Sequence, residues 1–473
     1  MSEVVTASQI DYKQNMFSHP SYKFEPQFPN TFGQSISLGS SQTPVTINLP
    51  PEVFNLAESI LSFTVNLPDA GAGNYIWYAQ QMLSEISHIQ FYSGSNQWIA
   101  DVDNLQNYLD IVLKKELSLR DFSTLDLSLD GLGVSNSGFN GIKALRNSNT
   151  TPVNVAAGPA YNANLNYVEP SYFNRGAAGD GAVAGLVTYN VQVPLKMIRN
   201  TVFSVNKNLY FGQTTYLKMY FGSINKVAYQ SDANTGPNAG NKALYAGAAT
   251  ITNLQLMLAV ESNESLRSEI IGKVSSSGLS YLIPYVQAFK NSNSGGSQNI
   301  SIQLDQGNGR SLMKVYHAPY NSQESLSTMY DHCNTSDVPA GAGAAAVGAP
   351  QKTQVYYTQL NGKRSQDINI NCSPTANPPL LDYMSHRRQI HGSVLQNANV
   401  YQYNWFHCDD FCDLPIDYTN EANSDLIAGI PMTVAPLTWS FVGVTMVNLV
   451  YYHYTWCVFV KKLTMTPSTI TVQ

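Results

Sequence analysis

Apolar and polar residues alternate along many short segments of this chain, as they do in strands that bury one face. The alternation is clear at 45–49, 61–67 and 187–195, and it recurs at 254–260 and 452–460. Turn residues such as Gly and Pro close most of these runs, which is typical of strands joined by surface turns. The pattern predicts an all-β chain with few short helices.

Near the middle of the chain the alternating pattern stops and a helical pattern begins. From Glu264 onward the apolar residues fall at helical spacing, with Leu266 and Ile270 on one face. Ser262 or Asn263 can cap this helix, and Glu264 complements the positive end of its dipole. We predict a short helix that connects two domains, with Glu264, Leu266 and Ile270 as the connector residues.

A second helical pattern follows Asp103. The apolar residues Leu105, Leu109 and Val112 mark one face of this segment, and Asp103 precedes it. An aspartate in that place is a typical N-cap, because its carboxylate accepts hydrogen bonds from the first free N–H groups of a helix. We therefore expect a helix after Asp103.

Strand patterns lie on both sides of the central helix. With 473 residues the chain exceeds the usual size of one hydrophobic core. Two consecutive β-sandwiches joined by a helical connector explain the pattern better than one large barrel. The expected divisions are an N-terminal arm at 1–27, a first sandwich at 28–262, the connector at 263–278 and a second sandwich at 279–473.

Three segments interrupt the strand pattern: 154–185, 230–247 and 334–350. They are rich in Gly, Ala, Asn and Pro. Such a composition buries too little apolar area to form a core of its own, so we predict long surface loops on a rigid scaffold. In an assembly such loops can become ordered against neighbouring subunits.

Several segments in the middle of the chain follow one another in a distinctive order. They are VQVPLKMI, NLYFGQTTYLKMYFG, ITNLQLMLAVESNESLRSEI, YLIPYVQ and SIQLDQGNGRSLMKVYHAPY. Together they resemble the central part of double jelly-roll major capsid proteins of double-stranded DNA viruses, in the lineage of virophages, polinton-like viruses and nucleocytoplasmic large DNA viruses. In that family the last strand of the first jelly roll leads into a short polar helix and then into a strand beginning like Tyr281–Ile283. The Gly/Ala-rich loops match nothing in the family, and Pro284 suggests that this strand lies at a sheet edge.

The resemblance implies a fold, a function and partners. The fold is two consecutive eight-stranded jelly-roll β-sandwiches, with few short helices and long surface loops. The function is that of a major capsid protein, which trimerises into pseudo-hexameric capsomers that tile an icosahedral shell. The implied partners are copies of the chain itself, neighbouring capsomers, and penton and minor capsid proteins, and an internal membrane beneath the shell is compatible with this. The implied location is the virion.

Charge and cysteine content narrow the choice of partners and compartment. The net charge is -6 and the chain has no concentrated Lys/Arg run, which argues against a sequence-specific nucleic-acid partner. The start, MSEVVTASQI, has neither a basic nor an apolar region typical of a signal peptide, so we expect synthesis in the host cytoplasm. The 5 cysteines are unevenly spaced, so a disulfide framework is not expected.

No motif in the chain predicts an enzyme or a cofactor. Neither Gly272-Lys273 nor Gly362-Lys363 has the earlier glycine of a phosphate-binding loop, and the glycines of 341–348 do not fit a dinucleotide fingerprint. The chain has no His-Glu-x-x-His, and the segment around Ser135 lacks the spacing of a nucleophile elbow. We therefore predict no catalytic residues and no cofactor.

The segment WFHCDDFC is the best candidate for a metal site. His407, Cys408 and Cys412 could supply three zinc ligands. A closed tetrahedral site needs a fourth ligand, for which the candidates are Cys372, His453 and Cys457. One Cys-x-x-x-Cys with a single histidine is a weaker pattern than paired Cys-x-x-Cys motifs, so thiols buried in a β core are the favoured interpretation.

Two other classes of protein remain as alternatives. A carbohydrate-binding or adhesive β-sandwich would suit the 29 Tyr and 5 Trp residues and the Asn-rich loops, but the missing secretion signal argues against it. A membrane-associated protein could use 426–460, which has no charged residue. Pro431 and Pro436 interrupt that segment and β-branched and aromatic residues dominate it, so we predict two or three buried strands there.

Overall fold

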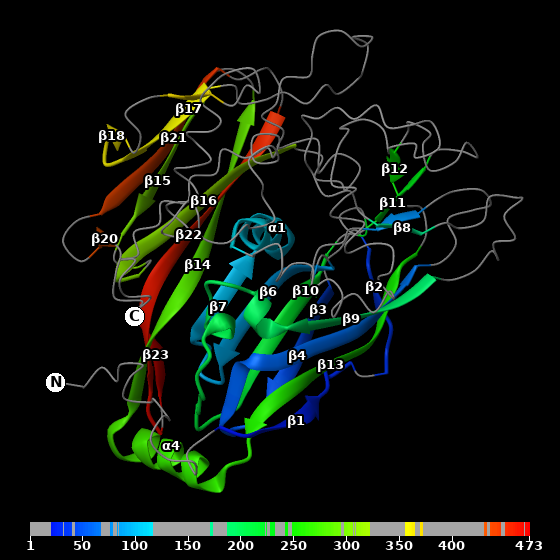
Figure 1. The fold of residues 1–473 in the computed structure, drawn as a ribbon, viewed down its shortest axis with the longest axis vertical. Helices are drawn as coiled ribbons and strands as arrows, with labels where there is room; N and C mark the ends of the chain where they lie inside the picture. Colours follow the sequence, from blue (N-terminus) through cyan, green and yellow to red (C-terminus); the bar gives the residue numbers. More distant parts are fainter. Residues whose placement is uncertain are drawn as a thin grey trace, which may run out of the picture.

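The structure is a computed structural model of the chain. It describes residues 20–31, 33–39, 43–67, 76–78, 83, 85–116, 171–173, 187–222, 224, 228–231, 242–244, 248–294, 298–305, 307, 309–321, 355–364, 369–371, 430–432, 436–445, 450–467 and 469–473. Strands dominate these residues, and they form two β-sandwiches side by side, which we call roll one and roll two (Figure 1). The predicted all-β class is confirmed.

Roll one consists of two antiparallel sheets that enclose a common core. Sheet 1A has the order β1 (Tyr22–Gln27), β13 (Thr250–Glu261), β4 (Phe54–Leu67) and β9 (Val187–Pro194), with β2 (Ile36–Ser37) added on β13. Sheet 1B has the order β3 (Thr43–Leu49), β10 (Thr215–Phe221), β6 (Ile86–Ser93) and β7 (Trp98–Asp103). The alternating apolar residues of the sequence face inward, as Leu217 and Met219 of β10 do.

Roll two repeats this arrangement. Sheet 2A has the order β14 (Leu279–Ser294), β22 (Val450–Met465), β16 (Ser311–Asn321) and β20 (Ile430–Pro431), with β23 (Ile470–Val472) added on β22. Sheet 2B has the order β15 (Gln298–Leu304), β21 (Leu437–Thr445), β17 (Val355–Leu360) and β18 (Lys363–Arg364), with β19 (Ile370–Asn371) added on β17. Pro284 lies in β14, an end strand of sheet 2A, as expected for a proline within a strand.

The two rolls have the same strand order. When the eight principal strands of each roll are counted along the chain, sheet A holds the first, eighth, third and sixth, and sheet B holds the second, seventh, fourth and fifth. This is the jelly-roll connectivity, in which two Greek keys close a sandwich. The predicted fold of two consecutive eight-stranded jelly rolls is therefore confirmed.

One segment differs from its expected role. Residues 22–27 were expected to belong to an N-terminal arm, but they form β1, the first strand of sheet 1A, paired with β13. The strand is at a sheet edge and its side chains are exposed or half-buried throughout, so its sequence lacks the apolar alternation that marks the other strands. An edge strand of this kind gives little signal in the sequence.

A small fifth sheet lies at the end of roll one opposite the central helix (Figure 1). Its order is β12 (Lys242–Leu244), β11 (Ala228–Ser231), β5 (Ile76–Tyr78) and β8 (Ser171–Phe173). Parts of 154–185 and 230–247, which were expected to be loops, thus contribute short strands. The segment 334–350 lies outside the described residues.

Sheet 2A is buried on both faces. Its inner face packs against sheet 2B through Cys457 and Phe459, and its outer face joins the hydrophobic cluster of roll one through Trp456 and Val458. A strand covered on both sides needs apolar residues at successive positions rather than at alternate ones. That requirement explains the almost uninterrupted apolar run at 454–460. The two rolls therefore form one continuous block.

Candidate functional site: the joint between the two rolls

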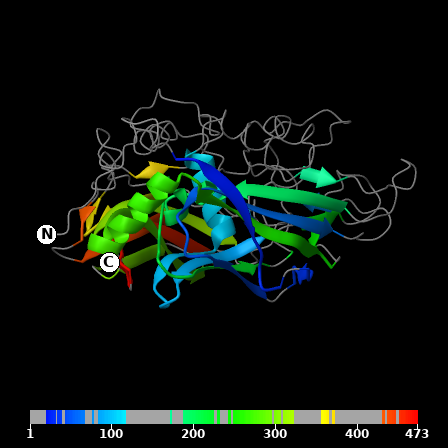
Figure 2. The ribbon, with the colours of Figure 1, turned by 90° about the horizontal axis from the view of Figure 1, so that it is seen from below.

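Helix α4 (Glu264–Ser277) connects β13 of roll one to β14 of roll two at one end of the molecule, nearest the viewer in Figure 2. Of the two residues predicted to cap it, Asn263 does so, because its side-chain oxygen accepts hydrogen bonds from the N–H groups of Ser265 (3.2 Å) and Leu266 (3.3 Å). Gly278 ends the helix with φ 73°, a conformation that favours glycine. Both ends of α4 are thus defined by local hydrogen bonds and backbone geometry.

The predicted apolar stripe of α4 faces roll one. Leu266 and Ile270 are buried against Val53, which lies just before β4. One turn further, Val274 is fully buried and joins the main hydrophobic cluster. The buried positions recur every four residues, so one face of α4 is anchored to the hydrophobic interior along its length.

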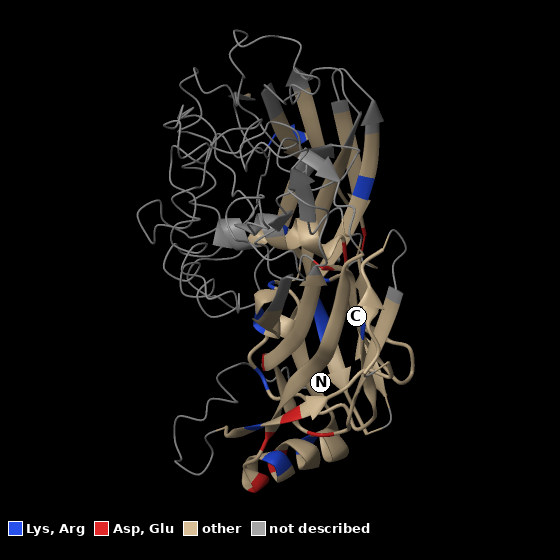
Figure 3. Cartoon of the chain, turned by 90° about the vertical axis from the view of Figure 1, so that its right-hand side faces the viewer, with Lys and Arg blue, Asp and Glu red and all other residues tan. Residues whose placement is uncertain are grey.

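Charged residues hold the exposed side of α4. Arg267 forms an ion pair with Glu52 in the turn before β4, and Lys273 pairs with Glu269 at 2.7 Å within the helix. Figure 3 shows these charges gathered at the lower end of the molecule. Exposed ion pairs contribute little to stability, about 0–1 kcal/mol, so the apolar stripe is the main attachment of the helix.

A buried carboxylate lies at the start of the connector. Glu261 is 1 % exposed and accepts hydrogen bonds from Asn208 Nδ2 (2.7 Å) and from the N–H groups of Ser21 (3.0 Å) and Asn263 (2.9 Å). Three donors satisfy the charge, and charge-assisted hydrogen bonds are among the stronger ones in proteins. The carboxylate thereby links three segments: Ser21 just before β1, Asn208, and Asn263 at the N-cap of α4.

The polar cluster around Glu261 extends to roll two. Asn208 accepts a hydrogen bond from Tyr22 through its side-chain oxygen (3.0 Å) and one from Tyr281 of β14 through its carbonyl (3.2 Å). Burial is the main cause that raises the pKa of Tyr22, so its hydroxyl stays protonated and able to donate. The chain of contacts from Glu261 through Asn208 to Tyr281 crosses from one roll to the other.

Aromatic residues fill the interface above the joint. Helix α1 (Leu105–Glu116) inserts between the rolls, and the ring of Tyr108 lies 6.4 Å from that of Tyr316 and 6.0 Å from that of Trp456. The Tyr108 hydroxyl donates to the carbonyl of Arg199 at 2.9 Å, which fixes the ring from its other end. All three rings are fully buried, so this contact excludes water.

The start of α1 differs from the prediction that Asp103 is its N-cap. The carbonyl of Asn104 accepts the first helical hydrogen bond, from the N–H of Tyr108 at 3.0 Å, so Asn104 is the N-cap position and Asp103 precedes it. Asp103 instead accepts a hydrogen bond from the N–H of Asn104 at 2.8 Å. Asn104 has φ 53°, a left-handed conformation that asparagine tolerates well. The chain turns sharply there and so moves the helix start by one residue.

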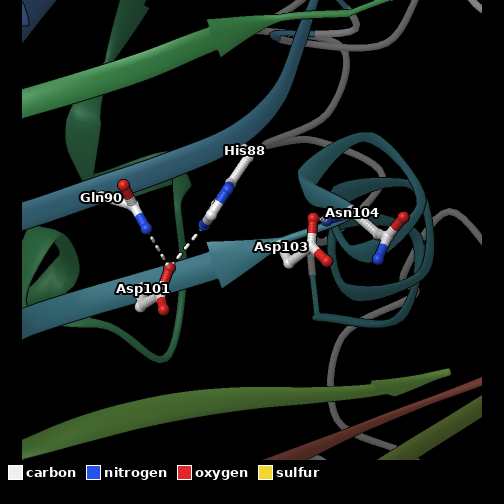
Figure 4. A network of polar contacts seen from close by, with 5 residues as sticks. All are labelled: His88, Gln90, Asp101, Asp103 and Asn104. Carbon is white, nitrogen blue, oxygen red and sulfur yellow. Dashed lines mark hydrogen bonds and ion pairs between the residues drawn. The ribbon is translucent and has the colours of Figure 1, made fainter. Parts of the chain in front are cut away.

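A polar network on β6 and β7 lies beside this turn (Figure 4). The Asp101 carboxylate contacts His88 Nε2 at 2.5 Å and accepts a hydrogen bond from Gln90 Nε2 at 3.2 Å. Burial, and after it the negative charge of Asp101, raise the pKa of Tyr285 in β14 to about 12. Strand β7 packs beside β14, so a carboxylate from roll one lies near a phenol from roll two.

Two histidines are buried inside roll two. His317 contacts Thr455 Oγ1 through Nδ1 (2.9 Å) and His453 Nδ1 through Nε2 (3.1 Å), and its ring stacks on Phe441. Burial lowers the pKa of His453 to about 3, and it lowers the pKa of His317 well below its usual value, with a further contribution from His453. Both rings are neutral in the folded protein and serve as parts of the core.

The predicted metal ligands are not brought together by any described contact. His407, Cys408, Cys412 and Cys372 lie outside the described residues. His453 and Cys457 lie in β22, and burial raises the pKa of the Cys457 thiol, which disfavours the thiolate that metals bind. Among the described residues there is no group of three or more His, Cys, Asp or Glu side chains placed to hold a metal ion.

The uncharged segment 426–460 contributes strands β20, β21 and part of β22. This agrees with the predicted buried strands. Within the part of the chain that the structure describes, none of the helices has the length and hydropathy needed to span a bilayer.

The Glu261 cluster and the Tyr108–Trp456 contact were not predicted from the sequence. Glu261 continues the alternation of β13, and nothing in the local pattern indicates that it is buried. Its three donors come from residues up to 240 positions away, so the cluster can be seen only in the folded chain. For the contact between Tyr108 and Trp456, the one signal in the sequence was that apolar residues stand at successive positions of 454–460 and not only at alternate ones.

The N-cap of α4 provides a first test. Replacing Asn263 with alanine leaves two helical N–H groups without their side-chain acceptor, so we expect the free energy of unfolding to fall by about 1 kcal/mol. Urea unfolding followed by circular dichroism measures this change. Ser276→Ala, an exposed change in the same helix, is the control and should shift stability by less than about 0.5 kcal/mol. Equal stability of the two variants would contradict the capping role.

Comparison with known proteins identifies the fold. No protein-family model matches the sequence, and no curated protein matches it significantly. Among solved structures, the Faustovirus major capsid protein aligns with 8% identity over 95% of this chain and 91% of that one, with a TM-score of 0.50. The capsid of the virus PBCV-1 aligns at 11% identity, 96% and 97% coverage and a TM-score of 0.49. The mavirus major capsid protein aligns at 8% identity, 99% and 93% coverage and a TM-score of 0.49.

Proposed function

We propose that this chain is a major capsid protein, a structural subunit that trimerises into pseudo-hexameric capsomers tiling an icosahedral viral shell. The observation that carries the proposal is the repeated jelly roll: two rolls of identical strand order fixed side by side by a sheet that is buried on both faces. Three copies of such a two-lobed block make a closed ring of six similar lobes. The Faustovirus protein of the same fold is named a major capsid protein.

The proposed mechanism is association geometry without a chemical reaction. A ring of six lobes closes only when the two lobes of each chain keep a fixed angle. Helix α4, the Glu261 cluster and the rings around Tyr108 all join roll one to roll two, and they would hold that angle. Glu264, Leu266 and Ile270 act in this proposal as connector residues that set the position of the helix.

The proposal assigns a location and partners. The chain would reside in the virion of a double-stranded DNA virus and contact copies of itself within and between capsomers. Penton and minor capsid proteins would complete the shell, and a membrane could lie beneath it. The small sheet at the end of roll one opposite α4 would lie on one surface of the shell, because the strands of both rolls run between the two ends of the block.

Electron microscopy of the purified protein, combined with light scattering, tests the proposal. We expect trimers with a pseudo-hexagonal outline, or shells built from them. A chain that stays monomeric under all conditions and binds glycans would contradict the proposal and favour a carbohydrate-binding sandwich.

The connector gives a more local prediction. Replacing Leu266 and Ile270 with serine removes the apolar stripe that fixes α4 to Val53, while the cores of both rolls remain intact. Fully burying a side chain of this size is worth about 1.5–3 kcal/mol, so the helix should detach before either roll unfolds. We expect folded chains that form fewer trimers or shells, measured by sedimentation and electron microscopy.

A matched double variant controls for changes in the helix itself. Glu269→Ser with Lys273→Ser alters two exposed residues of α4 and should leave assembly unchanged. If the Leu266/Ile270 variant assembled as well as the wild type, the connector role would be refuted.

A further inference from the structure

Strand β15 ends sheet 2B, and it lacks the usual protection of a sheet edge. An edge strand exposes backbone N–H and C=O groups that can pair with another strand, and natural proteins guard such edges with prolines, charged side chains or a covering segment. Every other end strand of sheets 1A, 1B, 2A and 2B contains a proline or a charged residue. Strand β15, with the sequence QNISIQL, contains neither.

Roll one covers the equivalent edge with its own chain. The second strand of roll one is β3, which ends sheet 1B as β15 ends sheet 2B. The segment between β1 and β3 lies along it, because Pro29 bridges to Ile47 and the N–H of Asn30 donates to the carbonyl of Thr46 at 3.3 Å. In roll two only 295–297 separate β14 from β15, which is too short a connection to cover the strand. Among the described residues, no backbone group outside β21 pairs with β15.

The sequence of β15 is almost the same when it is read in either direction from Ser301. Ile300 and Ile302 flank this serine, and the amides Asn299 and Gln303 come next. When two copies of the strand lie antiparallel with Ser301 opposite Ser301, Ile300 lies opposite Ile302, and Asn299 lies opposite Gln303. Each of these residues then faces a residue of its own chemical kind.

The burial of β15 agrees with such a pairing. Ile300 and Ile302 are 6 % and 5 % exposed and belong to the core of roll two, so a second copy of the strand would extend the same apolar layer. Asn299, Ser301 and Gln303 are exposed on the other face. Because asparagine and glutamine carry both donors and acceptors, the opposed amides can hydrogen-bond to each other across the strands.

We infer that β15 pairs with β15 of a second copy about a two-fold axis, which joins two copies of sheet 2B into one continuous sheet. A strand that adds to a sheet edge gains affinity from main-chain hydrogen bonds and specificity from its alternate side chains. The self-complementary sequence selects a second copy as the partner, because a two-fold axis places the same surface on both sides of a contact.

The symmetry of this contact places it between capsomers. Copies within a three-membered ring are related by a three-fold axis, so a two-fold contact cannot close that ring. The contact would link one trimer to the next, and this role in a shell rests on the proposed function. The pairing itself does not, since chains that form no trimer would still expose the same edge.

Charges at positions 299 and 303 test the pairing and its register together. In Asn299→Lys with Gln303→Lys, each lysine would lie opposite a lysine of the second copy. Like charges directly opposite each other destabilise a strand pair, so we expect the dissociation constant of the contact between trimers to rise by at least about tenfold. Sedimentation of trimers and their larger assemblies measures this change, and circular dichroism with urea unfolding checks the fold.

Asn299→Lys with Gln303→Glu is the matched control. It changes the same two exposed positions to charged residues, but each lysine would lie opposite a glutamate of the second copy. The contact should therefore be as tight as in the wild type or tighter. The two double variants differ in their effect only if 299 faces 303 across the contact.

Cysteine crosslinking identifies the register directly. Ser301→Cys places two thiols opposite each other, and mild oxidation should link two chains through the peptides that contain position 301. Gln303→Cys is the control, because position 303 faces 299 and should not link to itself, whereas a mixture of Gln303→Cys and Asn299→Cys chains should form links. Mass spectrometry of the linked peptides separates these bonds from bonds of the native cysteines.

The outcomes separate the inference from the proposed function. Links at 301, together with weaker association of the double-lysine variant, support the inference. Wild-type trimers or shells that both double variants form equally well, without any link between two 301 positions, overturn it and leave the capsid function standing. Chains that pair through β15 but never form trimers support the pairing and remove the capsid function. If the double-lysine variant fails to fold, the crosslinks decide alone, and links from 301 to any other segment would overturn the inference.

Discussion

Replacing Trp456 with alanine is expected to lower the free energy of unfolding by about 3–5 kcal/mol, the range found for large aromatic residues deleted from protein cores. Its ring is fully buried, lies 5.5 Å from that of Tyr454, and meets Tyr108 of the other roll at 6.0 Å. The cavity would open between α1 and sheet 2A, where both rolls contribute atoms and neither can close the gap alone. Urea unfolding at pH 7 measures the loss.

Trp456→Phe is the control for this prediction. Among the described residues, no group accepts a hydrogen bond from the indole Nε1 of Trp456, so phenylalanine keeps most of the apolar contact and removes an unpaired donor. We expect it to cost less than about 1.5 kcal/mol. An alanine variant as stable as the phenylalanine variant would mean that this contact does not hold the rolls together.

Lowering the pH is expected to destabilise roll two through its two buried histidines. In the unfolded chain both titrate near pH 6.5, whereas in the folded chain the pKa of His453 is about 3 and that of His317 is well below its usual value. The unfolded state therefore binds more protons below pH 6.5, and stability falls as the pH falls from there toward 3. For each histidine the slope is about half of 1.4 kcal/mol per pH unit at pH 6.5 and approaches that value at lower pH, so His453 alone accounts for about 1.5 kcal/mol between pH 6.5 and 5, and His317 adds to it in the same direction.

A double variant isolates this effect from other titrations. His317→Phe with His453→Phe keeps two aromatic rings beside Phe441 but cannot take up protons. Its stability at pH 7 should be lower, because Thr455 loses its partner, and its urea midpoint should change much less between pH 6.5 and 5. Equal pH slopes in the variant and the wild type would show that other groups control the response to acid.

The sequence predicted the parts of the fold that depend on local patterns. Alternation located the strands whose inner face alone is buried, such as β10, and the change of period at Glu264 located α4 with a cap at Ser262 or Asn263, of which Asn263 is the cap. The double jelly roll itself came from the resemblance of the central segments, and the strand order agrees with it. The connector role of Glu264, Leu266 and Ile270 stays a prediction.

Structural features that depend on contacts between residues far apart in the chain could not be predicted from the sequence. Strand β1 has no clear alternation because it lies at an edge, and Asp103 has the right residue type for a cap that the turn at Asn104 displaces. The burial of Glu261 depends on donors from three separate segments.

The pairing of β14 with β22 has a consequence for biosynthesis. These two strands pair along their whole length, from Leu279 with Met465 to Ser294 with Val450, and they form the wall that roll one packs against. A ribosome delivers the second of them long after the first, and contacts between residues so far apart in sequence form slowly. A prematurely terminated chain can complete roll one but never the wall beside it. Quality control would then be built into the order of synthesis, because only chains that extend through β22 acquire the rigid two-lobed form that the proposed shell requires.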